Sequence, residues 1–154
     1  LASIRSGMYE ATLRRMDPAV EVVGRACPLF VPLVESRRYQ RGDIVIETVA
    51  REYLEPLRGT GLDTLILGCT HYPLLVEVIA EIMGPGVTLV SAGEESAYEL
   101  KRTLQAGDAL SSPDRRGATA FYVSDRAEDF EETASVFLQE ELHHAAQRID
   151  IDQY

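Results

Sequence analysis

The sequence predicts a protein of the α/β class, with a mostly parallel sheet flanked by helices. Segments with the length and apolar content of strands alternate with segments of helical periodicity along the chain. One apolar run, 62–67, ends at Gly68 and is followed by the polar cluster Cys69, Thr70 and His71. In parallel sheets, ligands bind where strands end and helices begin, so this cluster is the candidate functional loop.

The first half of the chain is expected to contain two helices and two strands. The segment 2–16 has apolar residues at near-helical spacing and ends before an Asp-Pro pair, which stops a helix. The segment 19–28 has the pattern of a short strand, 42–57 that of a second helix, and 62–67 that of a buried strand. The apolar face of the second helix is expected to comprise Ile44, Val45, Val49, Tyr53 and Leu57.

The second half is expected to continue this alternation. Pro73 suits the first turn of a helix, and the Gly-Pro-Gly turn at 84–86 ends that helix. Ser91 stands three residues before Glu94, which is the spacing of a capping box at a helix start. The polar stretch 108–117 is expected to be a loop. The remaining predicted elements are the strand 87–90, the helix 91–106, the strand 118–123 and the acidic helix 124–142.

Length and composition argue against several classes of protein. The chain has 154 residues, 45% of them hydrophobic, which is enough for a real core. Its 25 acidic and 15 basic residues give a net charge of −10, so nucleic acid is not an expected partner. No apolar stretch has the roughly twenty residues of a membrane span, and two cysteines do not make a disulfide framework. We therefore expect a soluble, cytoplasmic protein with free thiols and no membrane partner.

The two cysteines have different local settings. Cys27 lies beside a proline among apolar neighbours, which is typical of a buried structural thiol. Cys69 follows a strand and precedes an expected helix start, where free N–H groups and the helix dipole stabilise an anion such as a thiolate. His71, two residues on, could exchange a proton with that thiol. Local pattern alone leaves nucleophilic, redox and acid/base roles open for Cys69.

Two longer motifs narrow these roles. The stretches GCTHYPLL (68–75) and ACPLFVPLVE (26–35) stand between SIRSGMYE near the start and SAGEESA at 91–97. In this order they resemble glutamate racemase, the isomerase that supplies D-glutamate for bacterial peptidoglycan without a cofactor. The related aspartate racemases have glutamate where His71 stands. The resemblance therefore implies glutamate as the small-molecule substrate and no cofactor.

The resemblance also implies roles for four residues of this chain. Cys69 matches the second of two catalytic cysteines, which deprotonates L-glutamate and reprotonates toward the L isomer. Thr70 and His71 match its partners, with both contacting the substrate and His71 assisting the thiol. Glu35 matches an acidic residue near that histidine, which orients it or tunes its basicity. No metal is implied, and the resemblance is compatible with a homodimer.

The chain lacks part of the family's pattern. It contains neither the Asp-Ser motif nor the Cys-Asn-Thr motif with the first catalytic cysteine, and it has no asparagine. We expect a carboxy-terminal portion of a two-domain racemase whose active site lies in the cleft between domains. Residues 1–90 are then most of the second α/β domain, and 91–154 are the returning part of the first. Such a fragment, with one catalytic cysteine, is expected to be inactive alone.

Two alternatives remain open from the sequence. The first is an enzyme like aspartate or hydantoin racemase, with the same chemistry on another substrate. The second is a non-catalytic domain that keeps the fold and serves as a binding module. The adjacent His143 and His144 could resemble a metal site, but histidine pairs on an exposed tail usually bind nothing specific.

Overall fold

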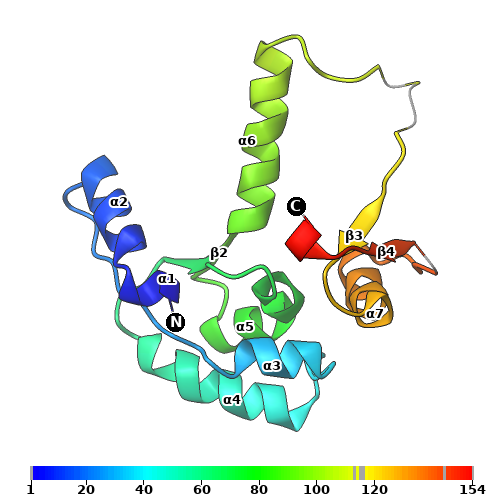
Figure 1. The fold of residues 1–154 in the computed structure, drawn as a ribbon. Coiled ribbons are helices and arrows are strands. Elements are labelled where there is room, and N and C mark those ends of the chain that lie inside the picture. Colours follow the sequence, from blue (N-terminus) through cyan, green and yellow to red (C-terminus); the bar gives the residue numbers. More distant parts are fainter. Residues whose placement is uncertain (1, 113, 115–116, 144, 154) are drawn as a thin grey trace. The chain divides into compact units, whose positions relative to one another are not determined.

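The fold is taken from a computed structural model that describes residues 2–112, 114, 117–143 and 145–153 (Figure 1). These residues form two compact units, the first ending at Thr103 and the second beginning at Leu104. Each unit combines helices with a two-stranded parallel sheet. The predicted α/β class and parallel pairing are confirmed. The predicted domains 1–90 and 91–154 refer to a complete two-domain protein and stay a prediction.

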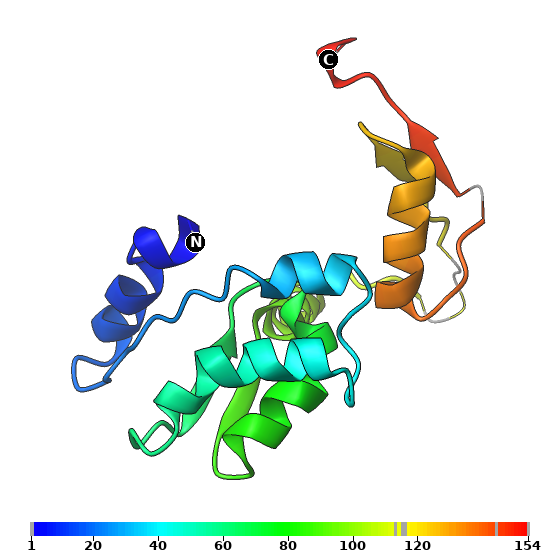
Figure 2. The same ribbon diagram turned by 90° about the horizontal axis from the view of Figure 1, so that it is seen from below.

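The first unit is built around the strands β1 (Thr64–Leu67) and β2 (Thr88–Ser91), which pair in parallel. Figure 2 shows the helices α3 (Phe30–Glu35), α4 (Ile44–Leu54) and α5 (Val76–Met83) gathered beside this pair. Because α5 connects two parallel strands, β1, α5 and β2 form one crossover unit. The buried apolar residues of the core are Cys27, Phe30, Val34, Ile46, Ala50, Tyr53, Leu54, Leu67, Leu75, Val78, Ile79, Ile82 and Met83.

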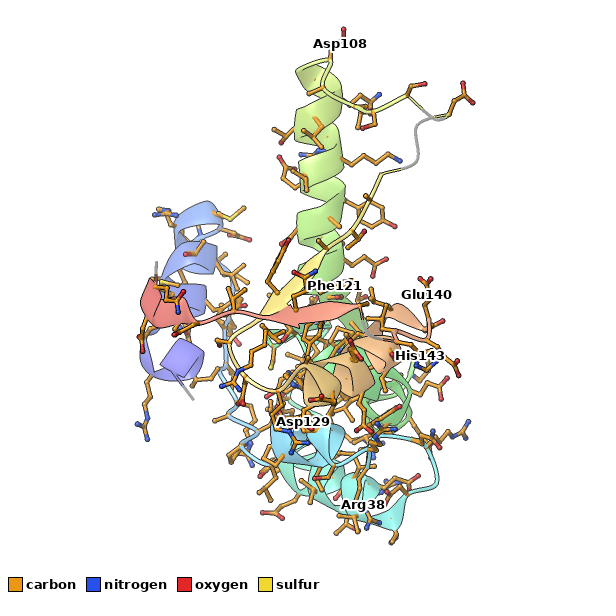
Figure 3. All side chains as sticks on the ribbon, turned by 45° about the vertical axis from the view of Figure 1, so that its right-hand side comes forward. Arg38, Asp108, Phe121, Asp129, Glu140 and His143 are labelled. Carbon is orange, nitrogen blue, oxygen red and sulfur yellow. The ribbon has the colours of Figure 1, made fainter. Side chains whose placement is uncertain are left out.

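The Asp43 carboxylate fixes the start of α4 by accepting hydrogen bonds from both the backbone and an arginine. The side chain of Asp43 accepts a hydrogen bond from the Val45 N–H at 2.9 Å, which satisfies an otherwise free donor of the first turn. The Arg38 guanidinium donates two hydrogen bonds to the same carboxylate, at 2.8 and 3.0 Å. These bonds hold the pKa of Asp43 below its usual range. Figure 3 labels Arg38 in the segment between α3 and α4.

The buried face of α4 differs from the predicted one. Of the predicted residues, Tyr53 is buried, whereas Ile44 is 71% exposed. The helix carries two overlapping apolar stripes, and periodicity alone does not distinguish them. Packing against α5 selects the stripe that contains Ile46 and Ala50, both fully buried.

The two isoleucines of α4 provide a matched test of this packing. We expect Ile46→Val to lower the free energy of unfolding by about 1 kcal/mol, because it removes one methylene from a fully buried site. Ile44→Val makes the same change on an exposed position of the same helix and should cost almost nothing. Denaturant unfolding of the two variants checks this. A larger loss for Ile44→Val would restore the predicted face.

The predicted helix 2–16 is interrupted. The structure has α1 (Ala2–Arg5) and α2 (Met8–Met16), with Gly7 between them in the left-handed conformation at φ 63°. Glycine adopts this conformation without the steric cost that a side chain brings, so the chain can turn sharply between the two helices. The apolar spacing therefore identified helical residues but not the turn.

The prediction of a strand at 19–28 is wrong. Apart from turn residues at its two ends, this segment has no regular secondary structure, and among the described residues no strand pairs with it. Val23 is 71% exposed, so one side of the segment faces solvent. Alternating apolar residues predict an extended backbone, whereas a strand also needs a neighbour to bond with.

The helix α6 (Ala92–Ala106) follows β2 directly, as Figure 1 shows. The Ser91 Oγ accepts a hydrogen bond from the Glu94 N–H at 3.3 Å, which confirms the predicted serine cap. The three short 3₁₀ helices described are η1 (Glu55–Leu57), η2 (Tyr72–Leu75) and η3 (Ile151–Gln153).

The second unit contains β3 (Phe121–Val123) and β4 (Ala146–Arg148), paired in parallel, and the helix α7 (Ala127–Leu138). The rings of Phe121 and Phe130 lie 5.6 Å apart between β3 and α7. The strand β4 was not predicted, and α7 is shorter than the expected helix 124–142. Residues 113, 115 and 116 of the expected loop lie outside the described residues. None of the described helices combines the length and hydropathy that a bilayer crossing requires.

Candidate functional site

The candidate site begins where β1 ends. Leu67 is the last strand residue and is buried, and Gly68 leads into the turn that carries Cys69. The Tyr72 N–H donates to the Cys69 carbonyl at 3.1 Å, which closes the turn. The strand therefore delivers Cys69 at the carboxyl edge of the β1–β2 pair, where parallel sheets bind their ligands.

The helix expected to start near Pro73 starts later. Residues Tyr72–Leu75 form the 3₁₀ turn η2, and α5 begins at Val76. Pro73 fits the start of η2, where its missing N–H is not needed. The turn that carries Cys69 is thus followed by a 3₁₀ turn that runs directly into α5, rather than by an α-helix start. The expected support of a Cys69 thiolate by a helix dipole stays a prediction.

Three predicted side chains converge on one imidazole. The Cys69 Sγ lies 3.9 Å from the His71 Nδ1, and the Thr70 Oγ1 lies 3.4 Å from the same nitrogen. On the other side of the ring, the His71 Nε2 lies 3.4 Å from the Glu35 Oε1. The structure therefore brings together Glu35, Cys69, Thr70 and His71, which are all the predicted site residues.

This arrangement supports proton transfer at the thiol. A carboxylate accepts hydrogen bonds, so Glu35 favours the tautomer with hydrogen on the His71 Nε2. The Nδ1 lone pair then faces the Cys69 thiol and can accept its proton. The distances are long for hydrogen bonds, as is common for catalytic groups before a substrate binds. The order carboxylate, imidazole, thiol is that of an activated cysteine.

The side chains of His71 and Glu35 differ in their exposure to solvent. The His71 side chain is 21% exposed, whereas that of Glu35 is 57% exposed. Water screens the Glu35 charge, so its pairing with His71 is weaker than a buried pair would be. We infer that Glu35 contributes more to the orientation of the ring than to its charge.

An aromatic contact brings Glu35 to the loop. Glu35 is the last residue of α3, and Phe30 at the start of that helix packs edge to face on Tyr72, with ring centroids 5.4 Å apart. The Tyr72 hydroxyl donates to the Cys27 carbonyl at 3.5 Å. These contacts tie α3 to η2, and hence Glu35 to His71. Sequence reasoning gave Tyr72 no role, because nothing local distinguishes it from an ordinary core aromatic.

Cys27 is structural, as predicted. It is 8% exposed, and burial raises the pKa of its thiol from 9.0 to about 11. Since the raised value favours the neutral thiol in the folded state, this contribution to stability is complete below pH 9.0 and is lost as the pH rises toward about 11. Burial also raises the pKa of Tyr72 to about 12, with smaller contributions from the neighbouring Cys27 and Cys69 thiols. Both groups are neutral at physiological pH.

Metal ligation finds no support in the described residues. Within them, no group of three or more His, Cys, Asp or Glu side chains could hold a metal ion. The His143 Nε2 pairs with the Glu141 Oε2 at 3.1 Å. His144, the other member of the histidine pair, lies outside the described residues.

Comparison with known proteins identifies relatives. No protein-family model matches the chain. The chain is 44% identical over 136 residues to the glutamate racemase of Geobacter metallireducens, covering 88% of this chain and 50% of that protein. It is 41% identical over 150 residues to the glutamate racemase of Lactiplantibacillus plantarum, covering 97% of this chain and 54% of that protein.

Solved structures agree with the sequence comparison. The crystal structure of glutamate racemase from Francisella tularensis in complex with D-glutamate matches with a TM-score of 0.86 and 31% identity. The match covers 99% of this chain and 56% of that one. The fold is therefore that of an amino-acid racemase, an α/β isomerase.

The chain aligns with the carboxy-terminal half of glutamate racemases. It spans about half the length of the curated relatives.

Proposed function

We propose that the complete protein interconverts L- and D-glutamate by proton transfer at the α-carbon. The observation that carries this proposal is the succession of Glu35, His71 and Cys69 at the end of β1, with 3.4 and 3.9 Å between successive groups. It occurs in a chain that is 44% identical to a glutamate racemase. A neighbouring structure in that family holds D-glutamate, which supports glutamate as the substrate.

Cys69 removes the α-proton of L-glutamate as a thiolate, and as a thiol it returns a proton on the same face. His71 accepts the thiol proton when the thiolate forms, Glu35 orients the imidazole, and Thr70 contacts the substrate together with His71. Inversion requires a second acid on the opposite face of the planar carbanion. Cys27 does not fit that role, because it is buried and its pKa is raised to about 11. We assign the second acid to a cysteine in the other half of the complete enzyme.

The proposal extends to the cofactor requirement, the cellular location, the use of the product and the architecture of the complete enzyme. The reaction uses no cofactor and takes place in the cytoplasm. Its product supplies D-glutamate for peptidoglycan. The enzyme can work as a homodimer, and the active site lies between two α/β domains.

The direct test is α-proton exchange in D₂O, followed by NMR on the complete protein. We expect both glutamate enantiomers to exchange and to interconvert, whereas this chain of 154 residues alone should not interconvert them. Aspartate and a 5-substituted hydantoin complete the substrate panel. Exchange of one of these instead of glutamate would favour the alternative racemases, and no exchange of any would favour a non-catalytic domain. Interconversion by this chain alone would show a second acid within it.

A further inference from the structure

We propose that Tyr9 is a positioning residue for Cys69. Its ring packs on Gly68, the residue before the thiol, and so fixes the point where β1 ends and the turn begins. A side chain at position 68 would press against Tyr9. The consequence for catalysis rests on the proposed function, whereas the contact itself does not.

The contact between Tyr9 and Gly68 is shown by the atoms that a Cβ at position 68 would meet. A Cβ added there would lie 3.3 Å from the Tyr9 Oη, 3.5 Å from its Cζ and 3.6 Å from its Cε2. The first distance is tighter than most real contacts of a Cβ, so a methyl group would displace the ring or the turn by a few tenths of an ångström. Tyr9 supplies all three of the nearest atoms.

Backbone conformation does not explain this glycine. Gly68 is absent from the glycines with positive φ, which include Gly7 and Gly84. An alanine could therefore adopt the local backbone without strain. The approach of Tyr9 is the feature of the structure that disfavours a side chain at position 68.

Residues beside Tyr9 make a second close approach to a glycine. The left-handed Gly7 turns the chain between α1 and α2, so that Ile4 and Glu10 both reach Gly24. A Cβ on Gly24 would lie 2.7 Å from the Glu10 Oε1 and 3.4 Å from the Ile4 Cδ1. Two neighbouring residues of α2 thus approach two different glycines, Gly24 in the segment 19–28 and Gly68 in the site loop.

The Tyr9 side chain carries this role by its bulk. In the described part of the chain its hydroxyl has no hydrogen-bond partner. The hydroxyl oxygen makes the nearest approach to a Cβ at position 68, and the ring atoms Cζ and Cε2 follow at ordinary contact distances. Phenylalanine keeps the ring on Gly68 and should therefore have a smaller effect than leucine, which removes the ring. Because a misplacement of about 1 Å can cost about a hundredfold in rate, a shift of a few tenths of an ångström should cost about tenfold.

A double-mutant cycle on the complete protein tests the contact. The variants are Gly68→Ala, Tyr9→Leu and their combination, with Tyr9→Phe for the hydroxyl. The control is Gly86→Ala, since a Cβ at Gly86 would meet nothing within 4 Å and its φ is not positive. The readouts are kcat and KM for L-glutamate, the melting temperature, and the rate of Cys69 alkylation by iodoacetamide, measured by mass spectrometry.

We expect Gly68→Ala to lower kcat about tenfold with little change in KM, and to lower it less than about twofold when Tyr9 is already leucine. Cys69 alkylation should change in Gly68→Ala and Tyr9→Leu, change less in Tyr9→Phe, and stay the same in Gly86→Ala. Equal effects of Gly68→Ala in both backgrounds would overturn the proposal. So would an equal change in alkylation in Tyr9→Phe and Tyr9→Leu.

The experiment still decides in two further cases. If Gly68→Ala does not fold, the comparison of Tyr9→Phe with Tyr9→Leu still decides, because both leave the glycine in place. If the wild-type protein does not racemise glutamate, the proposed function fails. The coupling between Tyr9 and Gly68 is then measured from the rate of Cys69 alkylation, which does not depend on turnover.

Discussion

Replacement of Cys69 by serine is expected to lower racemisation of glutamate by the complete protein about 10²- to 10⁴-fold. The α-proton of an amino acid is weakly acidic, so its removal needs a base that is present at neutral pH and is close to the carbon. A thiol ionises far more readily than a hydroxyl, and His71 lies 3.9 Å from the Cys69 sulfur to accept its proton. Serine has nearly the same shape but not this acidity.

The matched control is Cys27→Ser, which makes the same atomic change in the other cysteine. Cys27 is 8% exposed, and among the described residues its thiol donates one long hydrogen bond, of 3.8 Å, to the Arg25 carbonyl. A hydroxyl there is buried without a good partner, which costs about 1–3 kcal/mol of stability and little catalysis. Initial rates and denaturant unfolding of both variants give the comparison. A folded Cys27→Ser enzyme that is slower than a folded Cys69→Ser enzyme would remove Cys69 from the mechanism.

Those parts of the fold that depend on local signals could be predicted. The end of β1 at Gly68, the break at 84–86 and the cap at Ser91 each depend on residues that are close in sequence. Glycine, proline and a capping serine act on the backbone through their own geometry, whatever surrounds them. Sequence alone therefore placed β1, β2 and α6 within a few residues.

Those parts of the fold that depend on contacts with distant elements could not be predicted from the sequence. The segment 19–28 has the composition of a strand, but no described strand lies beside it. The helix α4 has two usable apolar stripes, and only its packing on α5 decides that Ile46 is buried and Ile44 is exposed. In both cases the missing information is the position of another element, which a local pattern does not contain.

The site residues also fall into those that local sequence indicated and those that it did not. Cys69, Thr70 and His71 are consecutive or nearly so, and a strand end followed by a polar turn indicated them without any relative. Glu35 is distant in sequence, and only the family resemblance connected it with His71. The structure supplies the physical link, because Phe30 and Tyr72 join α3 to η2. Tyr9 is distant as well, and only its contact with Gly68 indicates a role.

The His71→Asn variant is expected to show an effect that depends on direction. His71 contacts the thiol on the Cys69 side, so its loss should slow deprotonation of L-glutamate more than deprotonation of D-glutamate. The two enantiomers have equal free energies, and the equilibrium constant between them is one. Because kcat/KM must then fall equally in both directions, the asymmetry has to appear in kcat at saturating substrate. We expect kcat from L-glutamate to fall about tenfold or more, and kcat from D-glutamate to fall less.

Glu35→Gln should act in the same direction but more weakly, because the Glu35 side chain is 57% exposed and its charge is screened. Another histidine–glutamate pair among the described residues, His143 and Glu141 at 3.1 Å in the second unit, provides controls of identical chemistry. His143→Asn and Glu141→Gln should leave both values of kcat unchanged. The measurements are saturating initial rates from each enantiomer, and α-proton exchange from each in D₂O before inversion. Equal losses of kcat from both enantiomers in His71→Asn would contradict a role on one face, since a group that serves only Cys69 cannot slow both proton abstractions alike.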